Sequence, residues 1–225
     1  MAAIYGKLHN ADGLDTYMRT TLRPLDIVLI RSRPALTRLA IPSHFTHMAV
    51  WLGNKDELTR MGAFRVGDIN ARKETILSGN QFYESAGDSV RLAPLSNITN
   101  TDEIIIVRPS KLSDRRAVMK ISQLFEHLDK PFDFNFDFED KTRLTCMEVV
   151  ADVFPEYRLP VRYTSGRYAL VPDDLVWKAV ARDHGLKLVA HIVPNGRRGF
   201  KTAALGQVSE KLRKPASPPQ HVAIY

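Results

Sequence analysis

Short apolar segments bounded by turn residues fill the first half of this sequence, and they constrain the fold more than any other feature. Residues 24–31, 46–52 and 103–108 are rich in aliphatic and β-branched residues, as buried strands are. Residues 81–86 and 89–93 flank a Gly-Asp pair, which predicts a hairpin. Strands joined in this way pair with their neighbours in opposite directions, so the first half of the chain predicts an antiparallel sheet.

Helical periodicity follows in the second half of the chain. Apolar residues recur at helical spacing over residues 113–128, among them Ala117 and Ile121, which predicts an amphipathic helix. Further predicted elements are helices over residues 145–154 and 172–183 and a strand over residues 186–193. This order of strands and helices indicates the α+β class, with an antiparallel sheet packed against helices.

Residues 131–139 alternate between aromatic and polar side chains, which predicts a strand of period two. The aromatic side is Phe132, Phe134, Phe136 and Phe138, and the polar side is Asp133, Asn135 and Asp137. The polar side is similar to the opening of a calcium-binding loop. Such a loop also needs Gly at position 138 and Glu at position 144, where this chain has Phe138 and Leu144, so no calcium site is predicted.

Two stretches carry no regular pattern. Residues 55–79 are polar and punctuated by glycine, which predicts a loop-rich insertion. From residue 196 onward, basic residues and prolines predict a flexible basic tail. The predicted organisation is one folded domain over residues 1–195, with the insertion inside it, and a C-terminal tail over residues 196–225.

Composition limits the partners. The chain has 225 residues, of which 44% are hydrophobic, and this is enough for one substantial core. The net charge of +7 favours anionic partners, and an anionic surface is the predicted contact of the basic tail. The alternative is that the charge only keeps the protein soluble. Nucleic acid is disfavoured, because the predicted tail has only Phe200 and Tyr225 for base stacking. No stretch is apolar enough for a membrane span.

The single cysteine, Cys146, excludes an intrachain disulfide and suits a reducing compartment. The first residues lack the long apolar stretch of a signal peptide. The sequence therefore predicts a cytoplasmic protein, or one that is exported without a signal peptide of the usual kind.

Cys146 is also the first candidate for chemistry. It lies at the predicted start of a helix, where the helix dipole stabilises a thiolate, the form of cysteine that attacks carbonyl carbons. Backbone N–H groups of the first helical turn could also bind an oxyanion. The alternative is a buried structural cysteine with no chemical role.

His47 and Glu84 are the other two candidates. His47 opens an apolar strand, and a strand-borne imidazole that faces a helix-borne thiol is what a Cys–His pair requires. Glu84 lies in the next strand and would orient the imidazole, unless it is only an exposed carboxylate of an edge strand. His44, His47 and Cys146 could instead form part of a zinc site, but no fourth ligand stands at metal spacing, so no metal and no cofactor are predicted.

These candidates stand in the order His, Glu, Cys, whereas papain and the NlpC-type cell-wall hydrolases have the cysteine first. The chain resembles the circularly permuted papain-like amidases of the YaeF/YiiX type, within the NlpC-type superfamily. The resemblance rests on five segments in order, which are Leu25-Asp26-Ile27-Val28-Leu29, residues 43–50, Tyr83-Glu84-Ser85-Ala86, Lys130-Pro131-Phe132-Asp133-Phe134 and Thr145-Cys146-Met147-Glu148-Val149-Val150. The departures from the family pattern are Leu25, Asp129 and Met147, where the family has Gly, Gly and Ser.

The resemblance implies a permuted papain-like catalytic domain over residues 1–195 and a thiol mechanism. His47 would take the thiol proton, Cys146 would attack a carbonyl and form an acyl-enzyme, and Glu84 would hold the imidazole. The substrate would carry an amide bond in a peptide or peptidoglycan-like molecule. One alternative is a lipid acyl hydrolase or acyltransferase with the same site, favoured by the basic tail and by Met147, which would make the mouth of the site apolar. Another is a non-enzymatic basic binding protein.

Overall fold

An antiparallel sheet forms the centre of the protein, as the sequence predicts, and it has seven strands. The computed structural model describes residues 5–31, 43–110, 112–136, 138, 140–164 and 166–212. The strand order is β4-β3-β2-β1-β5-β8-β9, and each neighbouring pair is antiparallel. The strands are β1 (Ile27–Arg31), β2 (His47–Trp51), β3 (Phe82–Ala86), β4 (Ser89–Ala93), β5 (Glu103–Arg108), β8 (Lys187–Asn195) and β9 (Gly199–Thr202), with a separate hairpin of β6 (Val161–Thr164) and β7 (Arg167–Leu170).

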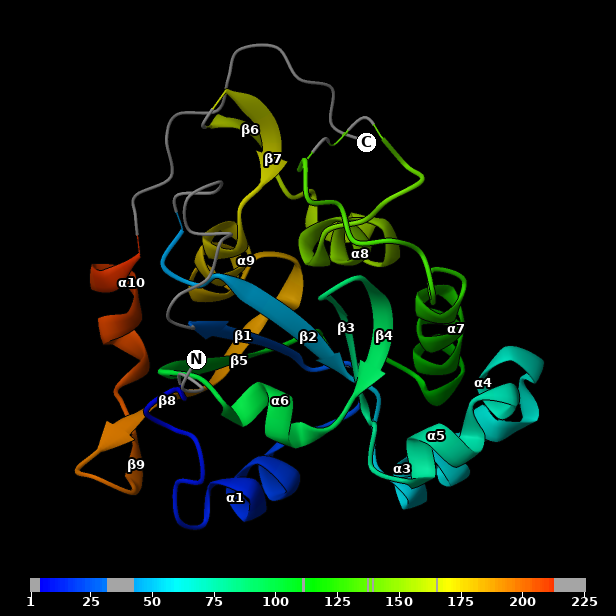
Figure 1. Ribbon diagram of the computed structural model, residues 1–225, viewed down its shortest axis with the longest axis horizontal. Helices are drawn as coiled ribbons and strands as arrows, with labels where there is room; N and C mark the ends of the chain where they lie inside the picture. Colours follow the sequence, from blue (N-terminus) through cyan, green and yellow to red (C-terminus); the bar gives the residue numbers. More distant parts are fainter. Residues whose placement is uncertain are drawn as a thin grey trace.

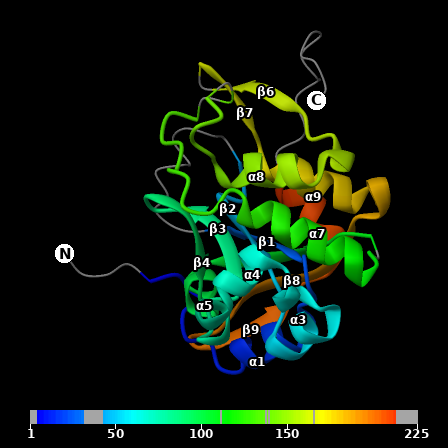
Figure 2. The ribbon, with the colours of Figure 1, turned by 90° about the vertical axis from the view of Figure 1, so that its right-hand side faces the viewer.

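Helices cover both faces of the sheet (Figures 1 and 2), which confirms the α+β class. The larger core lies under α7 (Asp114–Phe125), α8 (Cys146–Val153) and α9 (Pro172–Val180). A second core lies on the opposite face, under α1 (Leu14–Thr21) and α6 (Leu95–Thr99). None of the helices in the described part of the chain is long and apolar enough to cross a membrane. The remaining helices are α3 (Lys55–Met61), α4 (Gly67–Ala71), α5 (Lys73–Leu77) and α10 (Val208–Lys211), with 3-10 turns η1 (Ala63–Arg65), η2 (Pro155–Tyr157), η3 (Asp183–Gly185) and η4 (Leu205–Gln207).

The position of β1 explains why its sequence is an unbroken apolar run. Alternate residues of a strand point to opposite faces of the sheet. Ile27 and Leu29 therefore enter the larger core, while Val28 and Ile30 enter the second core. A central strand with helices on both sides has to be apolar throughout, because neither of its faces meets water.

The prediction of a loop-rich stretch over residues 55–79 is wrong, because most of it is helical. Asn54 and Glu57 form a capping box at the start of α3. The N–H of Glu57 donates to Asn54 Oδ1 at 2.9 Å, and the N–H of Asn54 donates to Glu57 Oε2 at 2.8 Å. Each of the three α-helices here buries an apolar residue in the larger core, namely Leu58, Ile69 and Ile76.

The strand predicted for residues 131–139 is also wrong for the part of it that the structure describes, since residues 137 and 139 lie outside the described residues. Phe132 makes an isolated bridge with Leu144, and Phe136 has a φ of 52°, which breaks the extended backbone. Phe132 and Phe136 are buried while Phe134 is 58% exposed, so the aromatic side chains do not share one face. The two buried rings pack against the end of β7 instead of forming one side of a strand.

The flexible tail predicted from residue 196 is wrong for residues 196–212. β8 and β9 form a hairpin across the predicted domain boundary, so the chain stays in the sheet at that point. α10 follows, and Val208 and Leu212 are buried in the larger core. The rest of the predicted tail, residues 213–225, lies outside the described residues.

Candidate active site

Strand pairing places His47 beside Glu84. β2 pairs with β3 so that Ala49 lies opposite Glu84. His47 is two residues before Ala49, and because alternate residues point to the same face, the side chains of His47 and Glu84 share one face of the sheet. His47 Nε2 lies 3.0 Å from Glu84 Oε2. Glu84 is buried, so it is not an exposed edge-strand carboxylate.

Arg91 holds the other oxygen of Glu84. It is the cross-strand partner of Glu84 in the β3–β4 hairpin, and its Nε and Nη2 donate to Glu84 Oε1 at 3.1 and 2.9 Å. Burial alone would raise the pKa of Glu84, but hydrogen bonds and charges from His47 and Arg91 outweigh burial and lower the pKa to about 2. Glu84 is therefore ionised at neutral pH, which suits a residue that orients a protonated ring.

Arg91 was not among the predicted site residues, although the hairpin sequence contains a signal for it. Gly87 and Asp88 form a two-residue turn, so residues equally far from the turn on its two sides face each other. Glu84 and Arg91 are equally far from this turn. A basic residue at position 91 could therefore have been assigned to Glu84 from the sequence.

Cys146 is the first residue of α8, at the helix start that the sequence predicts. Thr145 caps the helix: the N–H of Glu148 donates to Thr145 Oγ1 at 3.3 Å, and the N–H of Thr145 donates to Glu148 Oε2 at 2.7 Å. First-turn N–H groups have no partner within the helix, and the helix dipole favours an anion beside them. The Cys146 side chain is partly exposed, so a reagent can reach it.

Leu144, the residue before the capping Thr145, connects α8 to β3, the strand that carries Glu84. Ser85 Oγ donates to the carbonyl oxygen of Leu144 at 2.6 Å in a buried contact. The N–H of Asp133 donates to the same oxygen at 3.3 Å, and the N–H of Leu144 donates to the carbonyl of Pro131 at 3.1 Å. The loop for which a strand was predicted therefore braces the start of α8 against β3.

The ring of His47 also interacts with the Cys146 side chain, and this interaction raises the pKa of the ring. Burial lowers the pKa of His47, but the interactions with Cys146 and Glu84 outweigh burial and raise the pKa to about 10. The ring is therefore protonated at neutral pH. The structure thus brings together the three residues that sequence analysis selected, from β2, β3 and the start of α8.

His44 does not join this group. Its Nε2 lies 2.9 Å from Glu103 Oε2, at the start of β5. Within the part of the chain that the structure describes, no group of three or more His, Cys, Asp or Glu side chains is placed to hold a metal ion. The zinc alternative with His44, His47 and Cys146 therefore has no support in the geometry.

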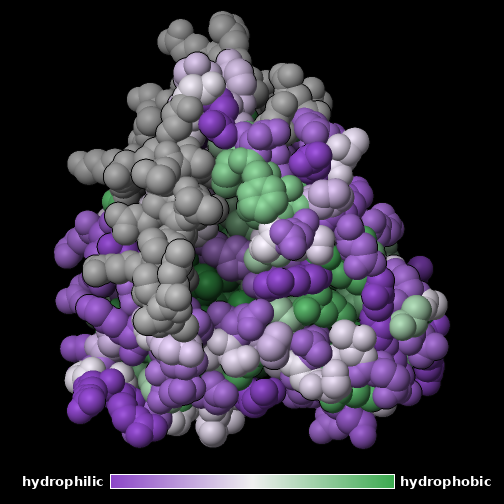
Figure 3. Space-filling view, in the orientation of Figure 1, coloured by the Kyte–Doolittle hydropathy of each residue, from purple (hydrophilic) through white to green (hydrophobic). Residues whose placement is uncertain are grey.

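Met147 was expected to make the mouth of the site apolar. Figure 3 shows a face that is mostly hydrophilic, with an apolar area near its middle, at the level of α8 in Figure 1. Met147 is 2% exposed and belongs to the larger core, so it does not line the mouth of the site as expected. The argument for a lipid substrate that rested on Met147 is therefore wrong.

Comparison with known families decides the class of the protein. Residues 21–225 match the model of a family described as permuted papain-like amidase enzyme, YaeF/YiiX, C92 family. The chain belongs to this family. It is therefore an enzyme, a cysteine hydrolase with a circularly permuted papain-like fold. The match extends through the C-terminal third of the chain, for which the five sequence segments offered no counterpart.

This permuted papain-like amidase is also similar to a solved structure. The crystal structure of metalloprotein YiiX from Escherichia coli O157:H7 has 19% sequence identity, covers 82% of this chain and 97% of its own, and has a TM-score of 0.45. No curated protein matches the sequence.

Proposed function

We propose that this permuted papain-like amidase cleaves an amide bond in a peptide or peptidoglycan-like substrate. Cys146 is the nucleophile, His47 is the acid and base, and Glu84 orients the His47 ring. The observation that carries the proposal is the His47 ring, whose Nε2 lies 3.0 Å from Glu84 Oε2 and which also interacts with the Cys146 side chain. A thiolate beside an imidazolium is the resting state of many cysteine nucleophiles.

The first half of the reaction forms an acyl-enzyme. The Cys146 thiolate attacks the carbonyl carbon of the amide and forms a C–S bond, while N–H groups at the start of α8 bind the oxyanion. His47 gives its proton to the amide nitrogen, the C–N bond breaks, and the amine leaves. The acyl group remains on Cys146 as a thioester.

Water completes the reaction. Neutral His47 takes a proton from water, and the water oxygen attacks the thioester carbonyl. The C–S bond breaks, the carboxylic acid is released, and the thiolate and imidazolium are restored. Glu84, which is ionised and held by Arg91, keeps the His47 ring in one orientation through both proton transfers.

The first test is the pH dependence of Cys146 alkylation by iodoacetamide in the wild type and in His47→Ala. We expect the wild type to react rapidly at pH 6, because His47 keeps its proton up to about pH 10 and stabilises a neighbouring thiolate. A free thiol has a pKa of about 8.5. At pH 6 we therefore expect His47→Ala to react more slowly than the wild type by about 10-fold or more. The single cysteine makes the label specific. Equal rates in the two proteins at pH 6 would contradict the pair.

Glu84→Gln tests the orienting role. We expect kcat/KM on a peptide amide to fall by about 10²-fold, the lower end of what acid–base catalysis contributes, because the reacting groups remain but the ring loses its charged partner. The matched control is Asp152→Asn, which removes a carboxylate that lies 2.7 Å from the ring of His127 instead. We expect the control to keep wild-type turnover, and a similar loss in both variants would argue against a specific role for Glu84.

A further inference from the structure

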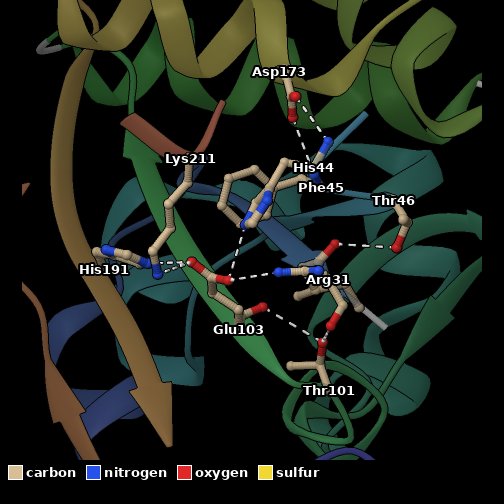
Figure 4. Close-up of polar contacts among 10 residues, drawn as sticks. Arg31, His44, Phe45, Thr46, Thr101, Glu103, Asp173, His191 and Lys211 are labelled. Carbon is tan, nitrogen blue, oxygen red and sulfur yellow. Dashed lines mark hydrogen bonds and ion pairs between the residues drawn. The ribbon is translucent and has the colours of Figure 1, made fainter. Parts of the chain in front are cut away.

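Residues 43–46 lead directly into β2 and its first residue, His47. The N–H of His44 donates to Asp173 Oδ2 at 2.8 Å, and the N–H of Phe45 donates to Asp173 Oδ1 at 3.0 Å (Figure 4). The two oxygens of one carboxylate thus hold two consecutive peptide groups. The contact joins parts of the chain that are 129 residues apart in sequence.

Asp173 lies in the first turn of α9 and is 2% exposed. Its own N–H donates to Ser43 Oγ at 3.3 Å, so the segment and the helix start satisfy each other's polar groups. Pro172 is the first residue of the helix, where its fixed φ favours a helix start. The local sequence therefore fixes Asp173 at the end of the helix that faces residues 43–46.

His47 depends on this segment more than the other residues of β2 do. On one side it pairs with Ile30 of β1. On the other side, the ladder with β3 begins only at Ala49, opposite Glu84. His47 therefore lies at the open end of the β2–β3 ladder. The backbone just before it is held by the N–H of Thr46, which donates to the carbonyl of Ile30 at 2.9 Å, and by the contacts of residues 43–45 with Asp173.

A second contact fixes the same segment through a side chain. His44 Nε2 lies 2.9 Å from Glu103 Oε2 (Figure 4). Burial alone would raise the pKa of Glu103, but its basic neighbours outweigh burial and hold the pKa well below its usual range. Glu103 is thus an ionised anchor for His44. Its other neighbours are His191 at 2.5 Å, Lys211 at 3.3 Å and Arg31 at 3.7 Å.

We propose that Asp173 is a positioning residue for His47. By holding residues 43–45, it keeps the His47 ring within reach of both Cys146 and Glu84. The inference rests on the proposed function of these three residues. A displacement of about 1 Å in an active site can lower the rate by about 10²-fold, so a carboxylate that acts only through the backbone can control the chemistry.

The next residue, Asp174, is a matched control. Asp174 is in the same turn of α9 and is also buried. Its carboxylate accepts from the side chain of Arg162 in β6, at 2.5 and 2.6 Å. Asp173→Asn and Asp174→Asn therefore remove the same charge from the same helix start. Asp173→Asn weakens the contact with the segment before His47, whereas Asp174→Asn weakens the contact with Arg162 of β6.

The experiment measures iodoacetamide alkylation of Cys146 from pH 5 to 9, together with thermal unfolding, in the full chain. We expect Asp174→Asn to keep the wild-type rate at pH 6. We expect Asp173→Asn to react at least about 10-fold more slowly at pH 6 and to approach the profile of a free thiol. If Asp173→Asn does not fold, Asp173→Glu serves instead, because it keeps the charge but displaces the carboxylate by one methylene, and we expect the same loss.

Two results would overturn the proposal. If Asp173→Asn loses thermal stability but keeps the wild-type pH profile, Asp173 supports only the fold. If both variants lose reactivity at pH 6 to the same extent, the loss reflects the helix start and not residues 43–46. In both cases a reactive wild type leaves the proposed function standing, whereas a wild type that does not react at pH 6 removes both proposals.

Discussion

Cys146→Ala and His47→Ala are each expected to lower turnover of a peptide amide by about 10⁴-fold or more. Without the thiol no acyl-enzyme forms, and without the ring neither the leaving amine nor the attacking water exchanges its proton. Because residues that act as one unit are not additive, the double variant should be no worse than either single variant. The measurement is kcat/KM, with acid-quenched mass spectrometry to detect the acyl group on Cys146.

The control for these variants is His127→Ala. His127 Nε2 lies 2.7 Å from Asp152 Oδ2, so it makes the same kind of ring-to-carboxylate contact as His47. We expect this variant to keep wild-type turnover, and we expect all three variants to keep the wild-type circular dichroism spectrum. Wild-type turnover in His47→Ala would show that His47 has no part in the reaction.

Arg108→Met is expected to lower the free energy of unfolding by about 3–5 kcal/mol. Asp26 is fully buried, and Arg108 Nε and Nη2 donate to its two oxygens, each at 2.7 Å. Methionine keeps much of the apolar stem of Arg108 but leaves the Asp26 carboxylate without its charged partner. Urea unfolding measures the loss, which corresponds to a fall in Tm of roughly 10 °C for a chain of this length.

Arg60→Met is the matched control for this prediction. Arg60 Nη1 also lies 2.7 Å from a carboxylate, that of Asp114, but the two side chains are 63% and 50% exposed. An exposed pair of this kind contributes about 1 kcal/mol or less. If Arg108→Met and Arg60→Met lose the same unfolding free energy, burial of Asp26 is not the cause of the loss in Arg108→Met.

The loss of unfolding free energy in Arg108→Met should also become smaller at acidic pH. Burial raises the pKa of Asp26 more than Arg108 lowers it, and without Arg108 the pKa rises further. The folded variant then binds a proton before the unfolded chain does, so its stability increases relative to the wild type as the pH falls. A loss that stays constant between pH 7 and pH 4 would contradict this explanation.

The strands of the central sheet were predictable because burial on both faces leaves a clear pattern in the sequence. Residues 103–108 form β5 with the predicted bounds, since Ile104 to Val107 fill both cores. The β6–β7 hairpin was not predicted, because only part of it is buried. Tyr163 and Tyr168 are 64% and 45% exposed, so no apolar run marks its strands.

Two wrong predictions have clear physical causes. The alternation over residues 131–139 predicts a strand only where a neighbouring strand is available for pairing, and here the chain turns to pack two rings against β7. The polar composition of residues 55–79 favours a loop. However, the capping box of Asn54 and Glu57 is a sequence signal for the helix that follows.

The residues of the proposed site differ in how far the sequence reveals them. Cys146, His47 and Glu84 could be selected by residue type, order and element, because each type is uncommon at such a position. Asp173 could not be selected, since it is adjacent to Asp174 in the same helix turn and both are acidic. Only the fold shows that Asp173 binds backbone N–H groups while Asp174 binds Arg162.

The order of these parts along the chain has a consequence for synthesis on the ribosome. A nascent chain leaves the ribosome with its N-terminus first and folds as it emerges. His47 and Cys146 therefore leave the ribosome before Asp173, β8 and α10 do. Until those later parts arrive, residues 43–46 lack the carboxylate that holds them, and β5 lacks its outer neighbour. We therefore expect the growing chain to carry Cys146 well before the contacts that hold the segment in front of His47 are complete.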